Sequence, residues 1–152
     1  MNAARIYAWM QTLLLCAFAA AVLFDRRAPL FFSPSLRAAG SLLCVAGVAL
    51  MAFALIALRN VVQISPEPRV GGELVTRGIY QRLRHPIYTA IVLLVVGMWL
   101  RVPTLSTAIV GGVVVVFLFV KVRVEERLLE ERYPGYAEYR KTSWGLIPGL
   151  PF

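Results

Sequence analysis

Residues 86–120 read PIYTAIVLLVVGMWLRVPTLSTAIVGGVVVVFLFV, and the prediction of the fold depends mainly on them. It holds two apolar runs, residues 87–100 and 104–120, with Pro103 between them. Proline fits the first turn of a helix but breaks a helix interior, so Pro86 predicts a helix start and Pro103 a break. At ~1.5 Å per residue, both helices fall short of a ~30 Å hydrocarbon core unless flanking residues extend them or the bilayer thins locally. The stretch therefore predicts a tight membrane hairpin.

Two further apolar runs precede this hairpin. Residues 6–24 carry no charge, residues 36–58 carry only Arg37 near their start, and Ser35 is the expected N-cap of the second run. With 59% hydrophobic residues and a mean hydropathy of +0.72, the 152-residue chain is more apolar than a soluble domain, in which roughly 45–50% is usual. We therefore predict an all-α integral membrane helical bundle with about four transmembrane helices.

The lysines and arginines are distributed unevenly over the two faces of this four-helix arrangement. The chain has 16 of them and a net charge of +8, and only Arg26, Arg27, Arg37 and Arg101 fall on one face. Cytoplasmic loops carry an excess of basic residues, so both termini and the loop 59–85 are expected in the cytoplasm. For a bacterial protein this would be the inner, or plasma, membrane. The basic residues form no block, which excludes nucleic acid as an expected partner.

Two local features have simple structural interpretations. Cys16 and Cys44 stand alone within apolar runs and lack CxxC spacing, so each is expected to be a small buried hydrophobe outside any disulfide framework. Arg5 precedes the first apolar run, as in a signal peptide, but no convincing cleavage site follows. The first run is therefore interpreted as a retained helix.

A charged helix is expected to continue from the hairpin into the cytosol over residues 121–132 and to end at Tyr133-Pro134-Gly135. Its double glutamates are compatible with a solvated helix whose charges compensate one another. On a helical wheel, however, Glu125 projects toward the apolar arc around Leu128, whereas Glu126 points toward the Arg123 side. A carboxylate on an apolar arc needs a partner, which could be a lysine one turn earlier or a ligand.

The only histidine, His85, lies where the chain re-enters the membrane, in Arg84-His85-Pro86-Ile87-Tyr88. An interfacial side chain is the ordinary interpretation of such a histidine. Its neighbours favour a binding site, because Arg84 adds a permanent planar cation and Tyr88 adds a hydroxyl. The free amides of a helix N-terminus also favour a bound anion such as a carboxylate.

Aromatic and basic residues alternate in the tail that follows. Tyr133, Tyr136, Tyr139 and Trp144 are interpreted mainly as interfacial anchors, with one or two of them packing on a nucleoside. The sequence contains no GxGxxG, no GxxxxGK[ST] and no HExxH. The usual soluble phosphate-binding and metalloprotease classes are thereby excluded.

Four segments, ELVTRGIY (73–80), RHPIY (84–88), EE (125–126) and YPGYAEY (133–139), follow one another in a distinctive order. Together they resemble the isoprenylcysteine carboxyl methyltransferase family, within the broader group of integral membrane methyltransferases that includes phospholipid methyltransferases. The resemblance covers about the C-terminal half of the chain. Residues 96–99 read VGMW and lack the Gly-x-Gly of the phospholipid enzymes, which argues against a phospholipid acceptor.

The resemblance implies S-adenosylmethionine as the cofactor and a single membrane methyltransferase-like domain over residues 1–152. Residues 1–60 would form the two N-terminal transmembrane helices, and residues 61–152 the cofactor-binding half. It assigns the catalytic roles to Arg84, which would orient an anionic acceptor, and Glu126, which would position the reacting groups; no metal is required. The residues that it places in the cofactor pocket are His85, Pro86, Tyr88, Glu125, Glu126 and Tyr136.

The expected substrate is a lipophilic small molecule or a lipidated molecule, methylated at a carboxylate, and membrane lipids are the expected surroundings. A small four-helix transporter is the alternative, but the cores of the predicted spans contain no Asp, Glu, Lys or His. A redox protein is disfavoured because one histidine cannot provide bis-histidine haem ligation. A structural helix bundle stays open, as do the identity of the acceptor and the oligomeric state.

Overall fold

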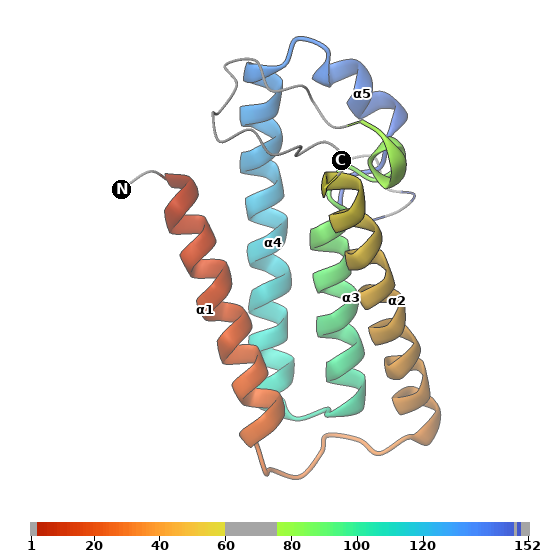
Figure 1. Ribbon diagram of the computed structural model, residues 1–152. Helices are drawn as coiled ribbons and strands as arrows, with labels where there is room; N and C mark the ends of the chain where they lie inside the picture. Colours follow the sequence, from red (N-terminus) through yellow and green to blue (C-terminus); the bar gives the residue numbers. More distant parts are fainter. Residues whose placement is uncertain (1–2, 60–75, 148, 150–152) are drawn as a thin grey trace.

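The computed structural model describes residues 3–59, 76–147 and 149 (Figure 1). Within these residues every extended secondary-structure element is a helix, and the predicted all-α class is confirmed. The helices are α1 (Ala3–Phe24), α2 (Pro34–Arg59), the short 3-10 helix η1 (Gly78–Gln81), α3 (Pro86–Arg101), α4 (Leu105–Arg132) and α5 (Tyr136–Thr142). Most of the loop 59–85, including Glu73, lies outside the described residues.

Local sequence explains where the long helices begin. Pro86 opens α3, as predicted. Thr104 caps α4 by accepting a hydrogen bond from the Thr107 amide at 3.3 Å. The start of α2 differs from the prediction, because the Ser33 hydroxyl, rather than that of Ser35, accepts the Leu36 amide at 3.4 Å. Pro34, which has no amide proton to satisfy, therefore occupies the first helical position.

Three helices are long and apolar enough to cross a membrane, with spans Ile6–Phe24, Pro34–Leu58 and Leu105–Arg132. α3 has 16 residues and is about 24 Å long, so it is shorter than a typical hydrocarbon core. α4 continues without a break from the membrane segment to Arg132, which confirms the predicted extension. The chain is thus an integral membrane protein in which one short helix lies beside longer ones.

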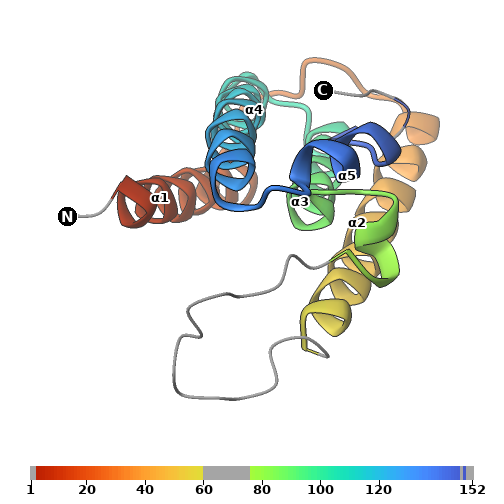
Figure 2. The same cartoon turned by 90° about the horizontal axis from the view of Figure 1, so that it is seen from above.

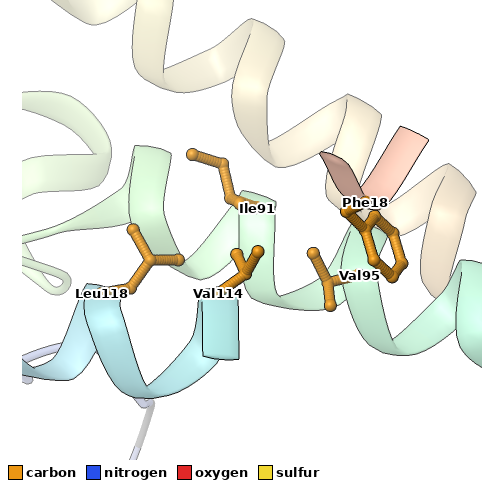
Figure 3. Packing of buried hydrophobic residues seen from close by; sticks show 5 residues of the cluster. All are labelled: Phe18, Ile91, Val95, Val114 and Leu118. Atoms are coloured by element: carbon orange, nitrogen blue, oxygen red, sulfur yellow. The ribbon is translucent and has the colours of Figure 1, made fainter. Parts of the chain in front are cut away.

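The four long helices lie side by side in the order α1, α4, α3, α2 when seen from above (Figure 2). α2 packs most extensively on α3, and α1 packs on α4. A core formed by Phe18, Ile91, Val95, Val114 and Leu118 joins α1, α3 and α4 (Figure 3). The links α1–α2 and α3–α4 lie at one end of the bundle, whereas α5, η1 and the start of α3 meet at the other (Figure 1).

Small residues allow α2 and α3 to approach closely. A Cβ atom added at Gly97 would lie 2.7 Å from both the Cys44 sulfur and the Gly40 carbonyl oxygen. Close approach through small residues is a common way of packing helices in lipid, where apolar burial drives association only weakly. In α4, a Cβ atom added at Gly111 would lie 3.1 Å from the Phe18 ring, a less severe approach, whereas nothing lies within 4 Å of one added at Gly112.

The two cysteines differ from the prediction of small buried side chains. Cys16 is exposed on the outer surface of α1, and Cys44 is half-buried at the α2–α3 contact. The prediction for Cys16 was wrong because an apolar surface residue of a membrane helix faces lipid rather than a protein core. Both thiols are free, so the chain has no disulfide.

Replacing Gly97 by alanine should loosen the α2–α3 contact, because overpacking typically costs about 1–3 kcal/mol. Gly112→Ala is the matched control, since it adds the same methyl group where nothing lies within 4 Å. Thermal unfolding in detergent measures the effect. A lower midpoint is expected for Gly97→Ala only, and equal midpoints for both variants would contradict the close packing.

Candidate functional site

The segment after α5 is fixed beside the entry to α3 by main-chain hydrogen bonds. The Arg84 amide donates to the Trp144 carbonyl at 2.8 Å, and the Trp144 amide donates to the Arg82 carbonyl at 2.8 Å. One turn into α3, the Thr89 hydroxyl donates to the Leu146 carbonyl at 2.6 Å. The C-terminal segment therefore covers the point at which the chain re-enters the membrane bundle.

The Arg84 side chain lies beneath this cover and is only 1% exposed. Its Nε donates to Glu126 Oε1 at 2.8 Å. Its Nη1 donates to the main-chain carbonyls of Arg140 at 3.0 Å and Ser143 at 2.5 Å. The guanidinium therefore joins three parts of the chain: the entry to α3, the end of α4 and the segment around α5.

Glu126 is the acidic centre of this buried cluster, and its side chain is 6% exposed. His85 Nε2 lies 3.3 Å from the Oε1 atom that binds Arg84, and Arg140 Nε lies 3.8 Å from Oε2. The His85 ring stacks on the Tyr88 ring, with 5.7 Å between centroids and 11° between planes. The carboxylate thus faces one buried cation and orients the imidazole at the start of α3.

A second polar cluster surrounds Glu125, the residue that precedes Glu126 in α4. Tyr88 donates to Glu125 Oε1 at 2.7 Å, and Lys121 Nζ lies 3.8 Å from the same oxygen. Lys121 also lies 5.0 Å from the centroid of the Tyr88 ring and donates to Gln11 Oε1 of α1 at 2.6 Å. Its side chain is only 12% exposed. Three helices therefore hold a carboxylate, an ammonium group and a phenol together at the membrane boundary.

Two hollows flank the Arg84–Glu126 pair. We call the first, of about 290 Å³, the Tyr88 hollow; it is lined by Gln11, Tyr80, Arg84, His85, Pro86, Ile87, Tyr88, Lys121 and Glu125. We call the second, of about 360 Å³, the Arg140 hollow; it is lined by Phe119, Val122, Arg123, Glu126, Arg127, Glu130, Arg140 and Leu146. The Tyr88 hollow contains an acid, a base and aromatic rings, and is close in volume to the smaller ligand pockets of proteins.

Two tyrosines of α5, Tyr136 and Tyr139, lie near enough to the Arg84–Glu126 pair to be affected by its charges. Burial, reinforced by the charge of Glu126, raises the pKa of Tyr136, whose side chain is 1% exposed. Its hydroxyl has no hydrogen-bond partner within the described part of the chain. Burial also raises the pKa of Tyr139 to about 12, and the Tyr139 hydroxyl donates to the Tyr80 carbonyl. Both phenols are therefore protonated at neutral pH, and Tyr139 is the one that donates to a carbonyl within the described residues.

The structure brings most of the predicted site residues together but distributes them differently from the prediction. His85, Pro86, Tyr88 and Glu125 line the Tyr88 hollow, whereas Glu126 lines the Arg140 hollow, and Tyr136 lines neither. Glu126 is the buried glutamate and Glu125 is half-exposed, which is the reverse of the helical-wheel interpretation. The wheel was wrong because it could not include the C-terminal segment, which covers the Glu126 side of α4.

Lys121, one of the two kinds of partner considered for Glu125, lies 3.8 Å from its carboxylate, but other contacts of the site were not anticipated. Gln11 was missed, although an amide within an otherwise apolar membrane helix is a usable signal for a polar partner. Ser143 and Leu146 contribute through main-chain carbonyls, for which the residue types carry no signal. The predicted role of Arg84 toward an acceptor stays a prediction; the contacts that the structure gives its guanidinium are with protein groups.

The family model described as phospholipid methyltransferase matches residues 36–135. A curated relative, the cobalt-zinc-cadmium resistance protein CzcN of Cupriavidus metallidurans, is 30% identical over 83 residues. These residues make up 54% of this chain and 38% of that protein. The matched family region begins within α2, so α1 and its Gln11 lie outside it.

Among solved structures, the chain is similar to the eukaryotic intramembrane Ras methyltransferase ICMT (isoprenylcysteine carboxyl methyltransferase). The TM-score is 0.61 at 20% sequence identity, and the match covers 99% of this chain and 55% of that one. At this identity the likeness concerns the fold. The chain spans less than two thirds of the length of each of these two proteins.

Replacing Glu126 by glutamine should destabilise the protein strongly, because removing one partner of a buried ion pair typically costs about 3–5 kcal/mol. Glu130→Gln is the control, since Glu130 pairs with Arg140 at a side chain that is 38% exposed, and exposed pairs contribute about 0–1 kcal/mol. Thermal unfolding and limited proteolysis of the C-terminal segment measure both changes. Similar losses in the two variants would contradict a central role for the buried pair.

Proposed function

Because this chain belongs to the phospholipid methyltransferase family, we propose that it is an S-adenosylmethionine-dependent methyltransferase that acts on a lipophilic acceptor at the membrane boundary. The resemblance predicted from the sequence is confirmed at the level of the membrane methyltransferase family. The proposal is supported above all by the Tyr88 hollow, in which His85, Pro86, Tyr88 and Glu125 meet Lys121. The transporter alternative receives no support from the family match.

The groups that line the Tyr88 hollow match the chemistry of the proposed cofactor. Its amino-acid part carries an ammonium and a carboxylate, for which Glu125 and Lys121 offer opposite charges 3.8 Å apart. Its ribose offers hydroxyls that carboxylates bind well, and its purine can pack on aromatic rings, here Tyr80 and Tyr88. The residues present therefore fit this cofactor, and Lys121 joins the predicted binding residues.

When bound, S-adenosylmethionine supplies an electrophilic methyl group, which an acceptor oxygen takes while the carbon–sulfur bond breaks and its electron pair returns to sulfur. This chain's residues have to align and dehydrate the reactants. A carboxylate acceptor is already ionised near neutral pH, so no residue has to remove a proton from it. We assign Glu126 and Arg84 to positioning: Glu126 orients His85, and Arg84 fixes Glu126 beneath the C-terminal segment.

An apolar hollow between α3 and α4 supports a lipophilic acceptor. It has a volume of about 360 Å³, and its lining includes Val95, Trp99, Gly111 and Gly112. An alkyl or isoprenoid chain is the kind of group that such a lining favours, because it offers apolar contacts and few hydrogen-bond partners. The acceptor carboxylate proposed from the sequence would then lie toward the polar end of the bundle.

We place the polar end, with both termini, in the cytoplasm, as the distribution of lysines and arginines predicts. We also propose one functional domain over residues 1–152. Two contacts support this unit: Gln11 of α1 binds Lys121 of α4, and Phe18 of α1 belongs to the same core as Ile91 of α3. The first membrane helix is thereby part of the proposed site.

A Lys121→Met variant tests the cofactor site. S-adenosylhomocysteine carries the amino-acid part, whereas 5′-methylthioadenosine lacks it. Loss of the Lys121 ammonium should therefore weaken the binding of S-adenosylhomocysteine only. A charged hydrogen bond contributes roughly 1.5–3 kcal/mol, which corresponds to about a tenfold or greater loss of affinity. Calorimetric titration of the purified protein measures both ligands, and Lys141→Met, at a side chain that is 70% exposed, is the control.

The outcomes of this titration separate the site from the function. If Lys121→Met weakens both ligands equally, or neither, the assignment of Lys121 to the amino-acid part is wrong. If the folded wild-type protein binds neither ligand, the S-adenosylmethionine-dependent function itself is wrong.

Acceptors that share one farnesyl chain but end in a carboxylate, an amine or a thiol test the reacting group. With labelled cofactor, methyl transfer to the carboxylate is expected to exceed transfer to the amine, because an ammonium must first lose a proton and the site is proposed to act by alignment. The product would be a methyl ester, which mild alkali releases as methanol. Preferred methylation of the amine would contradict the carboxylate proposal.

A further inference from the structure

The end of the bundle opposite the Tyr88 hollow gathers arginines that the methyltransferase proposal does not use. Arg27, Arg37 and Arg101 line one hollow of about 330 Å³, together with Asp25; we call it the arginine hollow. Its arginines come from the α1–α2 link, the first turn of α2 and the end of α3. Two parts of the chain that are distant in sequence, residues 25–37 and the end of α3, thus bring cations to one place on the face where basic residues are otherwise scarce.

The walls of the arginine hollow are held by specific contacts. The Leu30 amide donates to the Pro103 carbonyl at 2.7 Å, which joins the α1–α2 link to the α3–α4 link. The Phe31 ring lies edge-on to the Trp99 ring, with 5.8 Å between centroids and 88° between planes. Arg101 donates to the Ser41 hydroxyl of α2. The hollow is therefore built from two fixed links and two helix ends.

The positive charge in the hollow is only partly neutralised. Arg27 Nε lies 3.9 Å from Asp25 Oδ1, which also accepts the Arg27 amide at 3.0 Å. Among residues 3–59, 76–147 and 149, no carboxylate lies within 4.0 Å of the guanidinium of Arg37 or Arg101. Arg37 instead lies 5.8 Å from the centroid of the Phe32 ring. Two guanidinium groups are thus available to an anion.

Other features of the hollow suit a phosphate group at a membrane surface. Ser33 lines the hollow just before the 26-residue helix α2 begins. The amides of the first turn are not part of the proposed site, because Pro34 has no amide proton and the Leu36 and Arg37 amides already donate to Ser33. Arginine matches phosphate geometry better than lysine, because its planar group can donate two parallel hydrogen bonds. The exposed apolar side chains of Leu30, Phe32 and Leu36 lie in the same segment and can contact acyl chains.

We propose that the arginine hollow binds the phosphodiester headgroup of an anionic phospholipid in the leaflet opposite the methyltransferase site. Arg37 and Arg101 hold the phosphate, and Arg27, tied to Asp25, closes the rim of the site. The lipid would brace the junction of the two links and thereby stabilise the bundle. This inference depends on the chain spanning the membrane and is independent of methyl transfer.

Two measurements on the purified protein test the proposal, and neither requires activity. Native mass spectrometry from mixed phosphatidylglycerol and phosphatidylcholine should show preferential retention of phosphatidylglycerol by the wild type. Arg37→Gln and Arg101→Gln should each weaken this retention about tenfold, as expected for loss of a charged hydrogen bond. Arg26→Gln is the matched control, because it removes the same charge from the same link but Arg26 lines a neighbouring hollow.

Thermal unfolding in nanodiscs provides the second readout. Phosphatidylglycerol should raise the midpoint of the wild type and of Arg26→Gln relative to phosphatidylcholine, but not that of Arg37→Gln. Arg37→Lys keeps the charge, so phosphatidylglycerol should still raise its unfolding midpoint in part. This variant keeps the test valid even if Arg37→Gln folds poorly. An equal loss in Arg26→Gln, equal retention of both lipids by the wild type, or the same stabilisation by free glycerol phosphate would overturn the proposal.

Discussion

The ion pair between Arg84 and Glu126 connects the membrane bundle to the polar part of the chain. Its partners are 42 residues apart in sequence, and both side chains are withdrawn from solvent. Desolvating two charges costs more than their attraction alone recovers, so such a pair persists only when further hydrogen bonds satisfy it. Here the carbonyls of Arg140 and Ser143 satisfy the guanidinium, and His85 approaches the carboxylate. The entry to α3, the end of α4 and the C-terminal segment consequently share one fixed geometry.

The two ends of the bundle are organised by different physical forces. Within the membrane, small residues such as Gly40 and Gly97 let α2 and α3 approach closely, while the core around Val95 and Leu118 joins α3 to α4. At the polar end, hydrogen bonds hold the helices together, and Lys121 of α4 donates to Gln11 of α1. Since the matched family region begins at residue 36, this tie to the first helix is a feature of the chain beyond that region.

Hydropathy and proline positions predicted the helices well, because both act locally. Pro86 and Pro103 marked the hairpin, and the continuation of α4 followed from the pattern after Val120. The site was predicted by residue type but not by arrangement. Which glutamate is buried depends on the segment around Ser143, which contributes a main-chain carbonyl. A helical wheel of α4 does not include this segment. Likewise, exposure of Cys16 depends on which side of α1 faces lipid, and residue type alone does not determine this.

Photo-crosslinking can show whether S-adenosylmethionine binds beside the start of α3. Irradiation of the wild-type protein with labelled S-adenosylmethionine, followed by peptide mapping, locates the bound cofactor without assuming any acceptor. We expect saturable labelling within residues 80–88 and 121–125, and excess S-adenosylhomocysteine should remove it. Labelling confined to the Arg140 hollow, or labelling that S-adenosylhomocysteine does not displace, would contradict it.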